Sequence, residues 1–163
     1  MNISTIEPTA SAANSHDNVV EVLETLKDSY HGYRECADKA KDHDFKIRCA
    51  DLALKRKQMF NELKSVANYM GDLSLPEKDE PSGSVAAVFH RIYVDLKALI
   101  TRGDAEAIAE EIHRGEQVLL NTYAECLEKA DLSLTVRDLL VNQQTEIRRD
   151  VAGIDVEVLR HAA

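Results

Sequence analysis

Apolar residues recur at alternating steps of three and four along four long stretches of this chain. That spacing places them on one side of an α-helix, so each stretch is predicted to bury one face in a core. The expected buried seam of the first helix runs through Leu26, Tyr30 and Tyr33. The predicted helices cover residues 16–41, 45–71, 84–101, 105–130 and 134–160, the third being the short one.

Residues typical of helix ends separate these stretches. Ser15 and Asp44 are the predicted N-caps of the first two helices, because short polar side chains accept hydrogen bonds from the first backbone N–H groups. Gly71 and Gly103 are the predicted stops of the second and of the short helix. The expected division is a disordered segment, residues 1–14, and one helical domain, residues 15–163.

The connections between the helices predict their order in space. Short turns make the first two long helices antiparallel, and the last two likewise. The connection between the pairs holds the short helix, which can carry the chain back along the bundle and leave the second and third long helices parallel. The prediction is therefore an all-α, ferritin-like four-helix bundle with a long crossover that contains a short fifth helix. An up-and-down bundle with an extra helix is the alternative.

Composition and charge exclude several function classes. The 163 residues, 44% hydrophobic and 30% charged, fit a single soluble domain. The net charge of −9 argues against nucleic acid as a partner. No apolar run approaches the ~20 residues of a membrane span, and the N-terminus does not read as a signal peptide. We expect a cytoplasmic protein with no membrane partner.

Polar residues interrupt the apolar seam at one depth of the predicted bundle. Counted from the first turn at ~1.5 Å per residue, Tyr30, Arg56, Glu116 and Glu146 fall within a few ångströms of one layer. Arg149 follows Glu146 by three residues, almost one helical turn. The predicted polar core cluster is Tyr30, Arg56, Glu116, Glu146 and Arg149.

This layer departs from the ligand set of a di-iron bundle. Such a site takes a Glu from each of two helices and a Glu-x-x-His from each of the other two. Here Arg56-x-x-Met59 and Glu146-x-x-Arg149 replace both Glu-x-x-His motifs. An arginine cannot give up its proton to bind metal. The cluster is expected to fix helix register, or alternatively to bind a small ligand or a metal in a nonstandard way.

Several short motifs stand out along the chain: Lys27-Asp28, Gly32-Tyr33-Arg34, Ser82-Gly83-Ser84, His90-Arg91 with Asp95-Leu96-Lys97, and Arg114-Gly115-Glu116. They resemble those of an uncharacterised bacterial four-helix-bundle family placed in the ferritin-like superfamily. The resemblance spans about residues 16–155. It implies a ferritin-like fold and a soluble bacterial protein, with no established activity. A Glu in that family often stands where this chain has Tyr30, and a His where it has Asp150.

A second set of residues could bind metal. Glu110-x-x-His113-x-x-Glu116 places three possible ligands along one helix, but His113 lies beside the seam, which favours a solvated or partly buried histidine. The alternative ligands are Glu110, His113, Glu116, Glu146 and Asp150, and the alternative cofactor is iron or manganese.

Cysteines and glycines carry weaker indications. Cys36, Cys49 and Cys126 are scattered, with no Cys-x-x-Cys pair, and are predicted to be reduced packing thiols. Gly32 and Gly115 fall near one depth, which suggests a close approach of the first and third long helices; two unrelated glycines are the alternative.

These observations favour a nonenzymatic bundle with a structural, interaction or stress-related role and no catalytic residues, cofactor or intact di-iron site. The alternative is a divergent metal-binding or oxidoreductase member of the ferritin-like proteins. A homo-oligomer, most simply a dimer, and a protein partner are the expected assemblies.

Overall fold

A computed structural model of the chain describes residues 10–73, 84–103 and 105–161. The described residues form helices and short turns and contain no strand, which confirms the all-α prediction. The helices are α1 (Ala10–Lys39), α2 (His43–Met70), α3 (Ser84–Arg102), α4 (Ala105–Lys129) and α5 (Leu134–His161).

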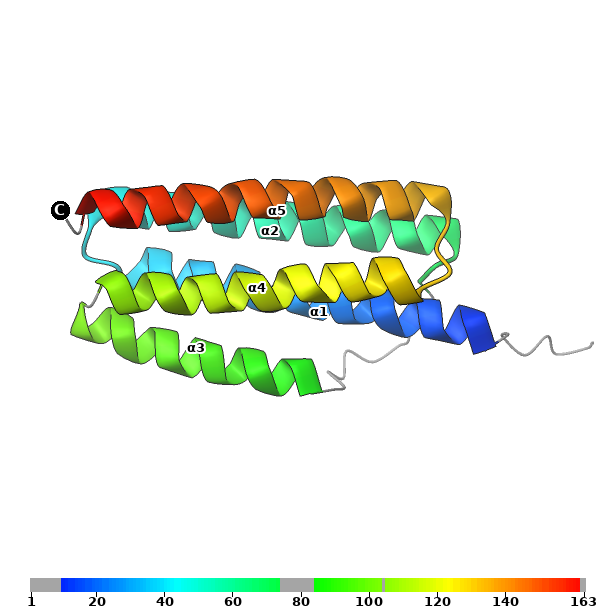
Figure 1. Cartoon of the computed structure of the whole chain (residues 1–163), viewed down its shortest axis with the longest axis horizontal. Helices are drawn as coiled ribbons and strands as arrows, with labels where there is room; N and C mark the ends of the chain where they lie inside the picture. Colours follow the sequence, from blue (N-terminus) through cyan, green and yellow to red (C-terminus); the bar gives the residue numbers. More distant parts are fainter. Residues whose placement is uncertain (1–9, 74–83, 104, 162–163) are drawn as a thin grey trace, which may run out of the picture.

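The four long helices α1, α2, α4 and α5 form one bundle. Both α1 and α5 pack against α2 and α4, so the four axes lie at the corners of a square. Helix α3 lies outside this square, against α1 and α4. It runs back along the bundle, so that α2 and α4 point the same way (Figure 1). This confirms the single crossover and excludes the up-and-down alternative.

Helix α1 begins earlier than expected. It starts at Ala10, so part of the segment predicted to be disordered is helical. Residues 1–9 lie outside the described part of the chain. Ser15 is therefore not an N-cap but a buried residue inside α1. Its hydroxyl donates to the backbone oxygen of Asp131 at 3.0 Å and accepts from the Asp131 N–H, which ties α1 to the turn between α4 and α5.

The ends of α2 follow the rules used to predict them, with one shift. Asp42, rather than Asp44, is the N-cap, and its Oδ1 accepts from the backbone N–H of Phe45 at 2.7 Å. The prediction chose the second of two aspartates in one turn. Gly71 ends α2 at φ 82°, a left-handed conformation that favours glycine, as predicted.

Two apolar clusters fill the bundle on either side of its middle. One, towards the α4–α5 turn, includes Leu26, Met59 and Leu119. The other, towards the α1–α2 turn, includes Leu52 and Ile112. On α2, the fully buried Arg56 lies between Leu52 of one cluster and Met59 of the other. The centre of the core is thus polar, with apolar packing above and below it.

Gly32 of α1 and Gly115 of α4 both lie against α3. A Cβ on Gly32 would lie 4.0 Å from Leu96, and one on Gly115 would lie 3.5 Å from Ile92, both residues of α3. The expected close approach of α1 and α4 is therefore wrong as an explanation of these glycines. They face the crossover helix instead of each other.

Among the described residues, no helix combines the length and the apolar character needed to span a membrane.

Candidate functional site

A fully buried guanidinium occupies the centre of the bundle. The side chain of Arg56 on α2 is 0% exposed, and charged side chains are rarely buried without partners. Its Nη2 donates to Oε2 of Glu116 on α4 at 3.0 Å, and its Nη1 donates to Oδ2 of Asp150 on α5 at 3.0 Å. One cation therefore joins carboxylates from two different helices.

Three further side chains extend these contacts to α1 and to the surface. Ser29 on α1 donates its hydroxyl to Oε1 of Glu116 at 3.0 Å. The Nζ of Lys55 lies 2.7 Å from Oδ1 of Asp150 and 3.3 Å from Oε1 of Glu146, which is partly exposed. Each of the four long helices contributes at least one group. We call these residues the central network: Ser29, Lys55, Arg56, Glu116, Glu146 and Asp150.

Tyr33 on α1 borders the central network. The Cζ of Arg56 lies 5.7 Å from the centre of the Tyr33 ring, within cation–π range. The Tyr33 hydroxyl is buried and has no hydrogen-bond partner among the described residues. Burial and the neighbouring Glu116 carboxylate raise the pKa of Tyr33 well above 10.0, so its phenol stays neutral.

The carboxylates keep both cations protonated. Burial by itself lowers the pKa of Arg56, but the charges around it, Glu116 foremost and Asp150 among them, more than offset burial and raise the pKa. The hydrogen bond to Asp150 raises the pKa of Lys55 as well. Two cations thus face three carboxylates, and both carboxylates nearest the centre already accept hydrogen bonds from the guanidinium.

The structure keeps two of the five residues predicted for the polar core cluster at the centre. Arg56 and Glu116 are there, as expected. Tyr30 is half-buried, and its hydroxyl accepts from Arg34 at 3.4 Å rather than from the central network. Glu146 reaches the network only through Lys55, and Arg149 is exposed.

Two residues take the places that the prediction gave to others. Ser29 replaces Tyr30 on α1, and Asp150 replaces Glu146 on α5, one helical turn further along. On α1, Ser29 stands beside the larger Tyr30, which the pattern selected instead. On α5, the pattern assigned Val151, next to Asp150, to the apolar seam, and so Glu146 was chosen for the polar layer. Lys55 was missed because it lies beside the seam. The one feature of the sequence that could have indicated Lys55 is its position next to Arg56, which was predicted to lie in the core.

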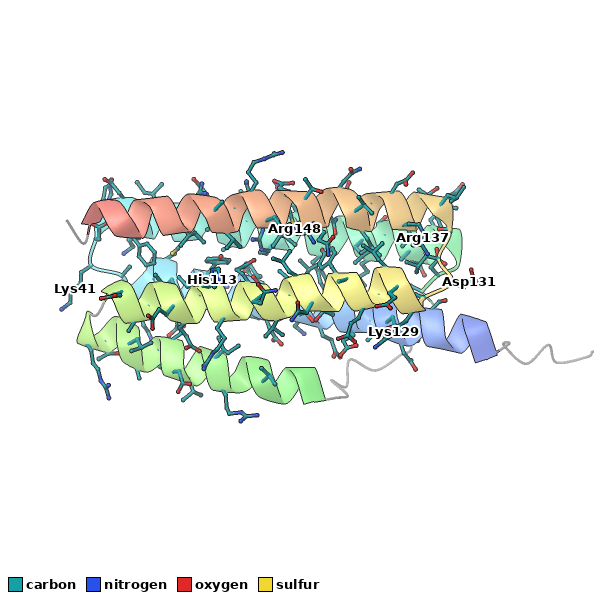
Figure 2. The ribbon with its side chains drawn as sticks, viewed as in Figure 1. Lys41, His113, Lys129, Asp131, Arg137 and Arg148 are labelled. Atoms are coloured by element: carbon teal, nitrogen blue, oxygen red, sulfur yellow. The ribbon has the colours of Figure 1, made fainter. Side chains whose placement is uncertain are left out.

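The alternative metal ligands fall into two separate groups, and neither forms a metal site among the described residues. Glu110 and His113, the latter labelled in Figure 2, are exposed on α4, while Glu116 is buried in the core. Glu116 and Asp150 are bonded to Arg56, and Glu146 to Lys55. Within residues 10–73, 84–103 and 105–161, no three His, Cys, Asp or Glu side chains are placed so that they could hold a metal ion.

The cysteines show no catalytic arrangement. All three are buried, and none of them forms a disulfide. Burial raises the pKa of the Cys126 thiol to about 12, which disfavours the thiolate that a nucleophile requires. The prediction of packing thiols agrees with this placement.

Comparison with known proteins gives one family. The model described as Domain of unknown function (DUF2383) matches residues 16–129, more than half of the chain. The chain belongs to this family. No curated protein and no solved structure matches it. The DUF2383 match agrees with the predicted resemblance to an uncharacterised family. It includes Ser29, Arg56 and Glu116 and ends before α5, so Asp150 lies outside it.

Proposed function

We propose that this DUF2383 protein is a ferritin-like bundle of the bacterial cytoplasm that lacks a di-iron site and acts by binding a partner, in a structural, interaction or stress-related role. The observation that carries the proposal is the place of Arg56. Its guanidinium lies at the bundle centre between two carboxylates, where ferritin-like bundles build their metal site from inward-facing side chains.

The chemistry of the central network supports this proposal. A metal ion bound by Glu116 and Asp150 would have to displace the guanidinium from both carboxylates. It would also stand within a few ångströms of a fixed positive charge, where repulsion in a poorly screened interior is strong. The guanidinium supplies positive charge to the two carboxylates in place of a metal ion, and it is held by a hydrogen bond to each of them.

Metal titration of the folded protein tests the proposal. Thermal unfolding should occur at the same temperature with and without excess Mn²⁺ or Fe²⁺, since a ligand that does not bind the native state cannot stabilise it. The matched control is Glu116→Gln with Asp150→Asn, which removes both inner carboxylate charges at constant shape. A rise in melting temperature that grows with metal concentration and disappears in this control would support the alternative, a divergent metal-binding or oxidoreductase protein.

We also propose that the chain forms a homodimer, the commonest symmetric assembly of soluble proteins. Ile47 and Leu54 support this, because they lie seven residues apart on α2 with exposed fractions of 49% and 55%. Such spacing is typical of a helix–helix seam. Sedimentation equilibrium should give twice the chain mass for the wild type and the chain mass for Leu54→Glu. A monomeric wild type would contradict the dimer.

A further inference from the structure

A groove lies between the end of α2 and the start of α5, away from the central network. Its volume is about 390 Å³. Val66 of α2 and Leu134 and Leu139 of α5 form its apolar lining, with Glu62 and Asp138 among the lining residues as well. The two helices that form it are neighbours along the side of the bundle opposite α3 (Figure 1).

Hydrogen bonds hold the two sides of this groove in place. The carboxylate of Asp72, just after α2, accepts from the backbone N–H of Ser133 at 3.2 Å and from its hydroxyl at 2.5 Å. The Ser133 hydroxyl also accepts from the backbone N–H of Val136 at 3.3 Å, so Ser133 is the N-cap of α5. The groove is therefore formed by two helices fixed to each other, and its shape exists before any partner binds.

The two most exposed large hydrophobic side chains of the described residues, Tyr69 and Leu134, belong to the end of α2 and the start of α5. Tyr69 is 88% exposed and Leu134 is 78% exposed, and Met70 beside Tyr69 is 39% exposed. Apolar and aromatic side chains around a hollow are typical of protein interaction sites, where a few such groups carry most of the binding energy.

The charge at the groove has one sign. Glu62 and Asp138 are the ionisable residues among those lining it, and both are acidic. Two basic residues close to them in the sequence, Arg137 and Lys64, make their contacts with residues that do not line the groove. Arg137, labelled at this end in Figure 2, donates to the backbone oxygens of Leu127 and Ala130 at the end of α4. Lys64 lies over the ring of Phe60, 5.8 Å from its centre.

We infer that this groove, between the end of α2 and the start of α5, is the docking site for a basic amphipathic helix of a partner protein. The partner would place an apolar side chain between Val66, Leu134 and Leu139, with lysine or arginine beside Glu62 and Asp138. Helices bind grooves in this way through an apolar stripe. The acidic lining and the chain's net charge of −9 favour a basic partner over a second copy. This inference rests on the proposed role in partner binding.

Binding of a fluorescently labelled helical peptide built from leucine and lysine tests the inference on the full chain. Saturable one-to-one binding is expected, and it should weaken at least about tenfold in Leu134→Ser, equivalent to about 1.4 kcal/mol. Glu62→Gln with Asp138→Asn should weaken it several-fold. The matched control, Glu106→Gln with Glu110→Gln on the exposed side of α4, should bind as the wild type does. Peptides with glutamate for lysine, or serine for leucine, should not bind.

Several results would overturn the inference. If the groove variant pair and the control variant pair lost affinity for the peptide equally, the peptide would be binding to acidic surface in general. A dimer that Leu134→Ser dissociates would make the groove a contact between copies. Absence of saturable binding would also reject it. Leu134 is so exposed that its variant should fold, and circular dichroism checks this. Metal titration of the same samples tests the proposed function separately, because absence of peptide binding leaves that result unchanged.

Discussion

Arg56 carries the charge around which the centre of the bundle is organised. It is fully buried, and two carboxylates from α4 and α5 accept its hydrogen bonds. Taking such a charge out of water is costly, and its partners offset that cost only while all of them are present. The central network is therefore expected to behave as a unit, so that removing one member leaves the others buried and uncompensated.

The first prediction follows from this dependence. Arg56→Met should destabilise the protein by about 3–5 kcal/mol, because Glu116 and Asp150 lose their common cation. Adding Glu116→Gln and Asp150→Asn should recover a large part of the loss, since the charges that lacked a partner are then gone. Urea unfolding of the single and the triple variant measures both effects. Equal stability of Arg56→Met and the wild type would show that the network is not a unit.

The second prediction compares two buried tyrosines. The Tyr33 hydroxyl has no hydrogen-bond partner among the described residues, whereas the Tyr123 hydroxyl donates to Oε1 of Gln143 at 2.8 Å. Tyr33→Phe should be neutral or stabilising by up to about 1 kcal/mol, and Tyr123→Phe should cost about 1 kcal/mol or more. Chemical denaturation of both variants checks the difference. The reverse order would mean that Tyr33 bonds to Glu116 in solution.

The third prediction concerns alkaline pH. The pKa of Tyr33 in the folded protein is raised above 10.0, the value of an ordinary tyrosine, mainly by burial. As the pH rises past that value, the unfolded chain loses the phenol proton and the folded chain keeps it, so folding stability should fall. Stability measured from neutral pH to above pH 10 should decline less in Tyr33→Phe. An identical decline in that variant would contradict the assignment.

At the scale of single elements, α3 is the helix whose packing the sequence described least well. It contacts α1 and α4 alone among the described helices, and Ile92 and Leu96 lie over two glycines. A methyl group added at Gly32 or Gly115 would lie 4.0 or 3.5 Å from its nearest neighbour. Both are ordinary van der Waals distances, so neither position is crowded.

The fourth prediction uses this space. Gly32→Ala and Gly115→Ala should each stabilise the protein by about 0.5–1 kcal/mol, because alanine favours the helix interior and the methyl fits against α3. Gly32→Leu should instead destabilise by pushing α3 away. Gly71→Ala is the control and should destabilise the protein, because a residue with a side chain is strained at a φ of 82°. Melting temperatures give the order, and a destabilising Gly32→Ala would reject the packing.

Much of the element level could be predicted from the sequence. The three- and four-residue spacing predicted five helices close to their observed bounds, and the long connection predicted the crossover. The site was predicted only in part. A seam can continue by a step of three or of four residues, so the spacing cannot decide between two neighbouring residues. It selected Tyr30 rather than Ser29, and Val151 rather than Asp150, as the residue expected to point into the core. Which neighbour points inward depends on its hydrogen-bonding partner, Glu116 for Ser29 and Arg56 for Asp150. Both partners lie on other helices.

At the scale of the whole molecule, the two sides of the bundle differ. Helix α3 covers α1 and α4, while α2 and α5 carry six of the seven large hydrophobic side chains that are exposed among the described residues. An ionic network at the bundle centre and exposed apolar side chains on the side that α3 leaves uncovered are the two features that support the proposed partner-binding role. The DUF2383 match includes α3 and ends before α5.

The metal content of the purified protein tests the central claim, that Arg56 occupies the place of a metal centre, most directly. The full chain would be purified from cells supplemented with iron and manganese and subjected to elemental analysis. Glu116→Gln with Asp150→Asn would be the matched control. We expect far less than one metal ion per chain in both proteins. One or more ions per chain in the wild type, lost in the control, would contradict the claim.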